Sequence, residues 1–206
     1  MKWKHWIDSH KGATPLFIIV LMMIFGRWDN PTAWIYLALH GSYGLLWVAK
    51  SRVFPDRQWE APAGLWRGLY IWGGLSLYWI APLIIMYGDL RAPAWLLGLA
   101  VAAYGVGVFL HFAADMQKHV ALSLRPGALI TDGLFSRVRN PNYLGEFLIY
   151  AGFSSLAMSF IPFIVLGLFL AIVWIPNMVK KDRSLARYPE FASYKARSKL
   201  LIPYLL

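Results

Sequence analysis

The sequence predicts an all-α membrane protein, a bundle of six transmembrane helices in a single domain (residues 1–206) with both termini in the cytoplasm. The first observation is composition, since 59% of the 206 residues are hydrophobic and 15% are charged, against about 25% charged in soluble domains. The second is a series of apolar stretches near the roughly 17–25 residues that cross a bilayer core as a helix. The third is the placement of lysine and arginine between these stretches.

Six stretches are expected to span the membrane. The first follows a segment too polar for the apolar core of a signal peptide, so it is expected to remain as a helix, and its Pro15 is tolerated in a first helical turn. The last two are separated by so few residues that they should form a helical hairpin. The expected spans cover residues 13–28, 31–49, 68–87, 93–114, 141–158 and 160–178.

The positive charges set the expected orientation. All lysines and arginines except Arg27 and Arg91 lie in the N-terminal segment, in the loops after the second and fourth spans, or in the C-terminal tail. Six spans place these four segments on one side, which should be the cytoplasm. The net charge of +10 is therefore assigned to an anionic membrane face, with membrane lipids as neighbours, and no nucleic-acid partner is expected.

Several classes of chemistry are excluded or unsupported. The chain has no cysteine, which excludes disulfides, thiolate metal sites and a cysteine nucleophile. No phosphate-binding P-loop, G-x-S-x-G elbow or HExxH metal motif occurs, and no metal site is expected.

Two pairs of polar residues are expected at the cytoplasmic end of neighbouring helices. His111 and Asp115 end the fourth span, and Asn142 and Glu146 begin the fifth, each pair on one helical face. The helix start carries partial positive charge, and the preceding loop adds three arginines. Together these features indicate a phosphate-binding site, although a capped helix with a salt bridge is the alternative. The arginines are Arg125, Arg137 and Arg139.

Two further groups of residues have two interpretations each. His40 and Tyr43 stand within an apolar run and can donate hydrogen bonds to a substrate carbonyl, or they can join helices to one another. Tyr188 and Tyr194 in the basic tail can reach back toward the arginine loop, or they can lie on the membrane surface.

The segments "LRPGALITDGLFSRVRNPNYLGE" and "RYPEFASYKARSKLLIPYLL" resemble the C-terminal family of steroid 5α-reductases and its bacterial relatives. The resemblance covers roughly residues 100–206. It implies that the N-Y-L-G-E motif, with the ends of the neighbouring helix and loop, forms a cytoplasm-facing NADPH site. Asp115 matches the acidic residue of an Asn-x-x-x-Asp pair, with His111 in place of the Asn. The implied cofactor-binding residues also include Arg125, Asn142, Tyr143, Glu146 and Tyr188.

The resemblance also implies a pair of residues that hold the substrate carbonyl. In animal steroid reductases these are a Glu from an early helix and a Tyr from the next helix. No Gln-Glu pair occurs in residues 1–30. Asp8 or His10 can stand in that place, and His40 or Tyr43 can supply the donor. The expected catalytic residues are therefore Tyr43, His40 and Asp8.

The same superfamily contains the isoprenylcysteine carboxyl methyltransferases, which bind S-adenosylmethionine. Their R-H-P-x-Y-x-G motif is matched here with Asn140 in place of the His. Lys180, Lys181 and Asp182 stand where an acidic pair is expected, and lysines suit a polyanionic dinucleotide better than a cationic sulfonium. The expected function is NADPH-dependent reduction of a carbon–carbon double bond conjugated to a carbonyl in a steroid-like or other lipid. The alternatives are a methyltransferase and a non-catalytic lipid-binding membrane protein.

Overall fold

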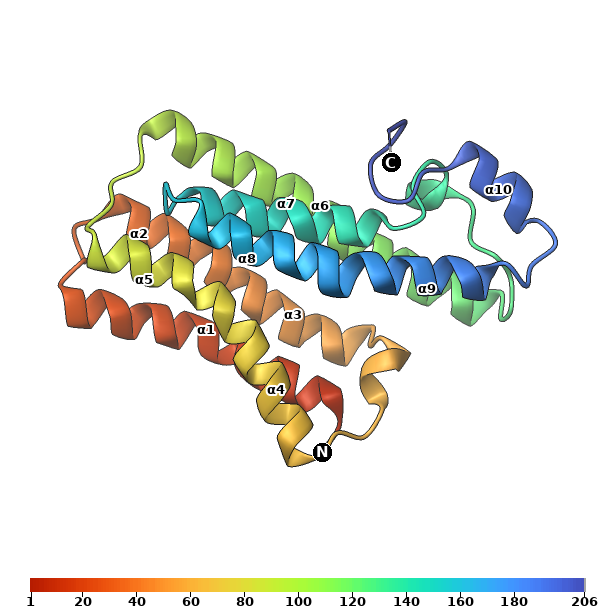
Figure 1. The fold of residues 1–206 in the computed structure, drawn as a ribbon, viewed down its shortest axis with the longest axis horizontal. Helices are drawn as coiled ribbons and strands as arrows, with labels where there is room; N and C mark the ends of the chain where they lie inside the picture. The colour runs from red at the N-terminus through yellow and green to blue at the C-terminus, as the bar shows by residue number, and fades with distance from the viewer. Residues whose placement is uncertain (206) are drawn as a thin grey trace. The chain divides into compact units, whose positions relative to one another are not determined.

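The computed structural model describes residues 1–205, apart from the side chain of Arg57, and within these residues the chain is all-α, with no strand. The helical stretches and the turns between them are coloured along the chain in Figure 1. In order they are α1 (Trp3–Phe25), α2 (Pro31–Tyr36), the π-helix η1 (Leu37–Gly41), α3 (Ser42–Val53), η2 (Arg57–Glu60), α4 (Leu65–Ser76), η3 (Leu77–Trp79), α5 (Ile80–Tyr87), α6 (Ala94–Leu124), η4 (Gly133–Phe135), α7 (Pro141–Ser155), α8 (Ile161–Phe169), η5 (Leu170–Trp174), α9 (Ile175–Leu185) and α10 (Phe191–Arg197).

Four of the helical stretches are long and apolar enough to cross a membrane, which supports an integral membrane protein. These are Trp3–Phe25, Leu65–Tyr87, Ala94–Leu124 and Ile161–Leu185. The other two expected spans correspond to the continuous stretch from α2 to α3 and to α7, which has 15 residues.

The helices extend beyond the expected apolar stretches at their polar ends. The first begins at Trp3 rather than near residue 13, because His10 and Lys11 are buried within the protein instead of lying in a solvated tail. The fourth continues to Leu124 and the last to Leu185. A prediction from apolar content alone therefore ends a helix too early where polar side chains are buried within the protein.

The first compact unit contains residues 1–104 and 150–165. Within it, α1 packs against α3, α4 and α5, and Figure 1 shows these helices side by side. Glycines set the distances from α1 to α3 and α4. A Cβ added at Gly44 would meet the Lys11 carbonyl, and one added at Gly68 would overlap the Trp6 ring. α1 is therefore the central helix of this unit.

Three helices of the first unit depart from regular α geometry. The stretch from α2 to α3 contains a full π-helical turn, η1. A 3₁₀ turn, η3, separates α4 from α5, and α1 carries Pro15 in its interior. A Cβ added at Gly41 would lie 3.2 Å from Cβ of Pro15, so two of these irregular turns are in contact. π-Helical turns inside α-helices are frequent at functional sites.

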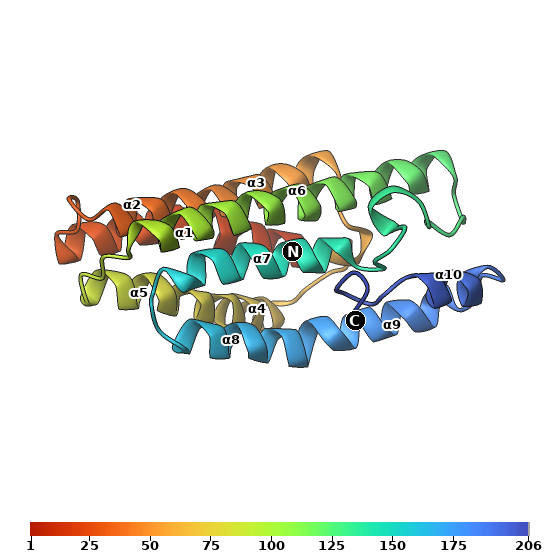
Figure 2. The same ribbon diagram turned by 90° about the horizontal axis from the view of Figure 1, so that it is seen from above.

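The second unit contains residues 105–149 together with the chain from Leu166 onward. Here α6 and α7 cross with no side chain between them, because a Cβ added at Gly107 would lie 2.7 Å from the Gly145 carbonyl oxygen. The C-terminal tail returns to the segment before α7, where the amide of Arg139 donates to the Lys199 carbonyl and that of Lys199 donates to the Arg137 carbonyl, both at 2.8 Å. Figure 2 shows α9, α10 and the returning tail.

The α6–α7 crossing generates the first prediction. Gly107→Ala should lower stability by about 1–3 kcal/mol, because its Cβ overlaps the α7 backbone. Gly105→Ala is the matched control on the same helix, since nothing lies within 4 Å of its added Cβ. The control should raise stability by about 0.5–1 kcal/mol through its helix propensity. Melting temperatures in detergent measure both, and equal effects of the two substitutions would contradict the close crossing.

Candidate functional site

The end of α6 and the start of α7 share a buried polar cluster in the second unit. His111 and Asp115 are each 2% exposed. Nδ1 of His111 lies 3.1 Å from the carbonyl oxygen of Asn142, and the Asn142 amide nitrogen donates to Asp115 at 3.2 Å. Lys118 forms an ion pair with Asp115 at 3.5 Å. The structure therefore brings together three residues of the two polar pairs, with Glu146 one turn further along α7 and half-buried.

The side-chain oxygen of Asn142 is a buried atom of this cluster. Within the described part of the chain it has no hydrogen-bond partner. A buried acceptor without a donor costs about 1–3 kcal/mol, so a ligand that donates a hydrogen bond here recovers that energy. Tyr143 contacts Trp174 of η5, with ring centroids 5.9 Å apart.

Arg139 holds protein segments together. Its guanidinium is buried and bonds both carboxylate oxygens of Asp182 at 3.0 and 3.1 Å and the Ser198 carbonyl at 2.6 Å. These bonds join the segment before α7 to α9 and to the tail. Arg125 and Arg137, in contrast, are exposed, and Arg125 forms an exposed ion pair with Asp132 at 3.2 Å. The three arginines therefore differ, and Arg125 and Arg137 are the two at the surface.

The side chain of Lys181 also bonds to other segments of the protein. Its ammonium donates to the Arg139 carbonyl at 2.8 Å and to the Asn140 side chain at 3.0 Å, and Asn140 donates to the Leu200 carbonyl at 2.9 Å. Lys181 is expected from the sequence to suit a polyanionic cofactor, whereas in the structure it bonds the segment before α7. With Asp182 bonded to Arg139, only Lys180 of this run is exposed.

The two tail tyrosines, Tyr188 and Tyr194, have different hydrogen-bond partners. The Tyr188 hydroxyl accepts a hydrogen bond from the neighbouring Arg187 at 3.1 Å. Tyr194 is the residue that reaches back, donating to the Phe135 carbonyl in the arginine loop at 2.7 Å. Burial raises the pKa of Tyr194 to about 12, so its hydroxyl remains a donor at physiological pH.

His40 and Tyr43 lie in the core of the first unit, and the rings of both are near Tyr150. His40 Nδ1 is hydrogen-bonded to the Tyr36 hydroxyl at 2.9 Å, and its ring stacks on Phe153 with centroids 4.2 Å apart. The ring centroid of Tyr150 is 6.4 Å from that of His40 and 5.6 Å from that of Tyr43. These two expected catalytic residues therefore share one buried aromatic environment.

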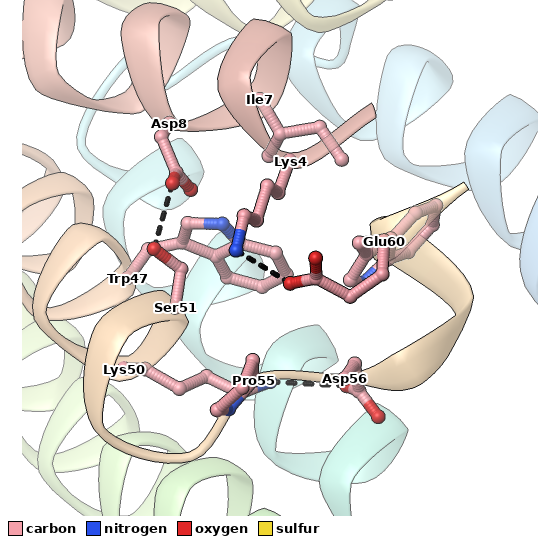
Figure 3. A pocket seen from close by; sticks show the side chains of 10 residues that line it. Lys4, Ile7, Asp8, Trp47, Lys50, Ser51, Pro55, Asp56 and Glu60 are labelled. Atoms are coloured by element: carbon pink, nitrogen blue, oxygen red, sulfur yellow. Dashed lines mark hydrogen bonds and ion pairs between the residues drawn. The ribbon is translucent and has the colours of Figure 1, made fainter. Parts of the chain in front are cut away.

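Asp8 has different surroundings. It accepts a hydrogen bond from Ser51 at 2.7 Å and lines a recess near the start of α1, shown in Figure 3. Lys4 bonds Glu60 there at 2.5 Å. Hydrogen bonds from Lys2 and Lys4 lower the pKa of Glu60 to about 2, so this contact persists at neutral pH. The lining includes neither His40 nor Tyr43: it consists of Lys4, Ile7, Asp8, Trp47, Lys50, Ser51, Pro55, Asp56, Trp59 and Glu60.

Comparison with known proteins identifies the family. The model of the family described as "Protein of unknown function (DUF1295)" matches residues 55–198, more than half of the chain. The chain belongs to this family. DUF1295 is related to steroid 5-alpha reductase-like membrane proteins, which agrees with the broader part of the sequence resemblance. Comparisons with the curated proteins and with the solved structures give no match.

The DUF1295 match includes the α6–α7 cluster and the Arg139–Asp182 ion pair, whereas Asp8, His40 and Tyr43 precede it. Sequence reasoning also missed the role of Lys11. This residue is 3% exposed, donates to the Tyr150 hydroxyl at 2.5 Å and lies 4.2 Å from the ring centroid of Tyr43.

A signal for Lys11 was present in the sequence. Lys11 shares the helical spacing of the buried residues around it, which continue its face of α1 in both directions. Its charge placed it in an expected cytoplasmic segment. The buried residues of α1 are Ile7, His10, Lys11, Thr14, Ile18, Leu21 and Met22.

The ion pairs of the second unit generate the second prediction. Asp182→Ala should lower stability by about 3–5 kcal/mol, because it leaves the buried Arg139 charge without its partner. Asp132→Ala removes the exposed partner of Arg125 and should cost no more than about 1 kcal/mol. Thermal unfolding in detergent compares the two variants. A small effect at Asp182 would mean that Arg139 does not depend on this ion pair.

Proposed function

We propose that this chain is an NADPH-dependent membrane reductase that saturates a carbon–carbon double bond conjugated to a carbonyl in a steroid-like or other lipid. The observation that carries the proposal is the buried side-chain oxygen of Asn142, which has no partner in the described residues and lies in the N-Y-L-G-E motif. An amide or hydroxyl of a dinucleotide is a suitable donor to that atom. The relation of the family to steroid reductase-like membrane proteins supports the same class.

The residues of the second unit fit a polyanionic dinucleotide. Asn142 would accept a hydrogen bond from a carboxamide or ribose hydroxyl, with Glu146 one turn away as a second acceptor. Arg125 and Arg137 are exposed and would meet phosphate groups. Arg139 would act indirectly, because its bonds to Asp182 and Ser198 fix the start of α7. Bound NADPH would supply a hydride.

The first unit supplies the proposed groups for the substrate. Negative charge develops on a carbonyl oxygen when a hydride adds to the β-carbon of an enone, and fixed donors in a dry site stabilise it. Tyr43 is fully buried and His40 is 2% exposed, so both lie in such surroundings. Lys11, in contact with the Tyr43 ring, adds positive charge that favours the same oxygen.

The third prediction tests the cofactor. Glu146→Gln should weaken NADPH binding roughly tenfold or more, since a hydrogen bond to a charged group contributes about 1.5–3 kcal/mol. Asn142→Ala should weaken it less, since a hydrogen bond between neutral groups contributes about 0.5–1.5 kcal/mol. Arg137→Ala should weaken it too, whereas Lys195→Ala, at an exposed residue of α10, is the charge-matched control that should not. Equilibrium binding and melting temperature are measured together.

Several outcomes would reject this assignment. Unchanged NADPH affinity with a lower melting temperature would make the motif a structural helix start. Stabilisation by S-adenosylmethionine alone would support the methyltransferase. Stabilisation by neither cofactor would favour a lipid-binding protein.

We also infer six spans with both termini in the cytoplasm. Within the first unit, Asp29 pairs with Arg91 at 2.8 Å and Asn30 donates to Asp89 at 2.8 Å, so the loop after α1 and the loop after α5 lie together. At the other end of α1, Lys2 pairs with Glu60 at 2.7 Å. Within the first unit these segments therefore lie at the two ends of α1, which supports the inferred topology.

The fourth prediction tests this topology. A tag at either terminus should be accessible from the cytoplasm alone, because these segments hold most of the positive charge. A reporter inserted between Gly88 and Asp89 should be accessible only from the opposite side. Accessibility in sealed membrane vesicles of known orientation measures all three positions. A terminus on the outer side would overturn the six-span topology.

A further inference from the structure

The recess near the start of α1 is formed by three segments of the first unit (Figure 3). They are the first turns of α1, the end of α3 and residues 55–60. The space, counted with its open mouth, is about 300 Å³, which suits a small polar group rather than a ring system. Six of the ten lining residues precede residue 55, where the family match begins. The family match therefore does not account for this recess.

Backbone hydrogen bonds hold the walls of the recess together. The amide of Ala63 donates to the Met1 carbonyl at 2.8 Å, and the amide of Trp3 donates to the Ala61 carbonyl at 3.0 Å. These bonds join the segment after α3 to the first residues of the chain. The recess is therefore formed by the folded protein itself, as most ligand sites are.

Two ion pairs of different exposure line the recess. Lys50 and Asp56 lie 3.3 Å apart, and their side chains are 4% and 14% exposed. Lys4 and Glu60 lie 2.5 Å apart, and their side chains are 26% and 31% exposed. The first pair is internal, whereas the second is accessible to a ligand. An ammonium group has three N–H donors, so Lys4 can bond a second acceptor besides Glu60.

Asp8 adds a third carboxylate to the lining. Its Oδ2 accepts a hydrogen bond from Ser51 at 2.7 Å, whereas its buried Oδ1 has no hydrogen-bond partner among the described residues. Buried polar atoms are nearly always bonded, and the exceptions need an explanation. In the described part of the chain, no three His, Asp or Glu residues are arranged to hold a metal ion. An organic ammonium group is the charged donor that suits this carboxylate.

The recess lies where a membrane meets water. It is at the start of α1, which is long and apolar enough to span a bilayer. Tryptophan is enriched at this level. Trp47 and Trp59 line the recess, and the ring centroid of Trp3 is 6.0 Å from that of Trp59. The Trp47 ring already contacts an ammonium group, since Nζ of Lys50 lies 4.8 Å from its centroid. Phospholipid headgroups are the ligands present at this level.

We propose that this recess binds the zwitterionic headgroup of phosphatidylethanolamine, with its ammonium group donating to Asp8 and its phosphate accepting from Lys4. The lining carries charges of both signs, as does this headgroup. The primary ammonium group has three N–H donors, whereas the trimethylammonium group of phosphatidylcholine has none. The recess therefore distinguishes lipids by the number of N–H donors on the headgroup nitrogen. This lipid site is independent of the proposed reduction.

The test uses the full chain purified in detergent and three dioleoyl lipids as probes. Phosphatidylethanolamine, its N,N-dimethyl derivative and phosphatidylcholine share the phosphate and the positive charge, but their nitrogens carry three, one and no N–H donors. Affinity is measured by native mass spectrometry, and stabilisation by thermal unfolding. Wild-type protein should bind phosphatidylethanolamine at least fivefold more tightly than phosphatidylcholine, with the dimethyl lipid between them. The melting temperatures should rise in the same order.

Two substitutions separate the two halves of the headgroup. Asp8→Asn keeps an acceptor for Ser51 but removes the negative charge, so it should reduce phosphatidylethanolamine affinity at least tenfold and abolish the preference over phosphatidylcholine. Lys4→Gln acts on the phosphate that both lipids share, so it should weaken both and keep their ratio. Glu190→Gln, at an exposed residue of the second unit, removes one negative charge elsewhere and should leave affinity and preference unchanged.

A soluble headgroup identifies the source of the ligand. sn-Glycero-3-phosphoethanolamine has the same headgroup without acyl chains and should bind at least tenfold more weakly than the lipid. Equal binding of the two would overturn the assignment to a lipid. Equal affinities of wild-type protein for phosphatidylethanolamine and phosphatidylcholine, or a preference that Asp8→Asn leaves unchanged, would overturn the site itself.

Discussion

The close contact of α6 and α7 is the constraint on which the arrangement of polar groups depends. In the second unit Gly107 and Gly145 bring the two backbones together, and a Cβ on Gly145 would meet both the Gly107 carbonyl and the His111 amide. In the first unit the same two helices remain close, since a Cβ on Gly152 would lie 3.0 Å from the Ala100 carbonyl oxygen. In a membrane such packing replaces the hydrophobic drive for helix association. It also places the buried Asp115 within reach of Asn142.

Buried charges in this protein are satisfied in two different ways. Arg139 has a carboxylate partner and a carbonyl, which is the arrangement that a buried ion needs. Lys11 is surrounded by the rings of Tyr43, Trp47 and Tyr150, and it bonds a tyrosine hydroxyl. Aromatic faces stabilise a desolvated cation by about 2 kcal/mol or more. The first arrangement joins segments through an ion pair, whereas the second holds a cation among aromatic rings.

Some buried polar side chains join segments of the chain, and others keep atoms without partners among the described residues. Asn140, Lys181 and Asp182 bond to neighbouring segments and lock the start of α7. Asn142 and His10 each keep buried polar atoms without partners in the described residues. The Asn142 oxygen carries the proposal of a dinucleotide site, and the two residues belong to separate compact units.

The sequence by itself determined the all-α class and the approximate places of the apolar helices, because a low charge content and long apolar stretches are sufficient for that. It also indicated the polar ends of α6 and α7, since a spacing of four residues places side chains on one face. Only the tertiary structure decided which charges are internal. Arg139 and Arg137 are two residues apart, yet one is buried against Asp182 and the other is exposed. Lys11 likewise lies in a segment that the sequence predicts to be cytoplasmic, yet its side chain is buried. The partners of these cations are distant in sequence, and the energy of a charge depends on the groups that surround it after folding.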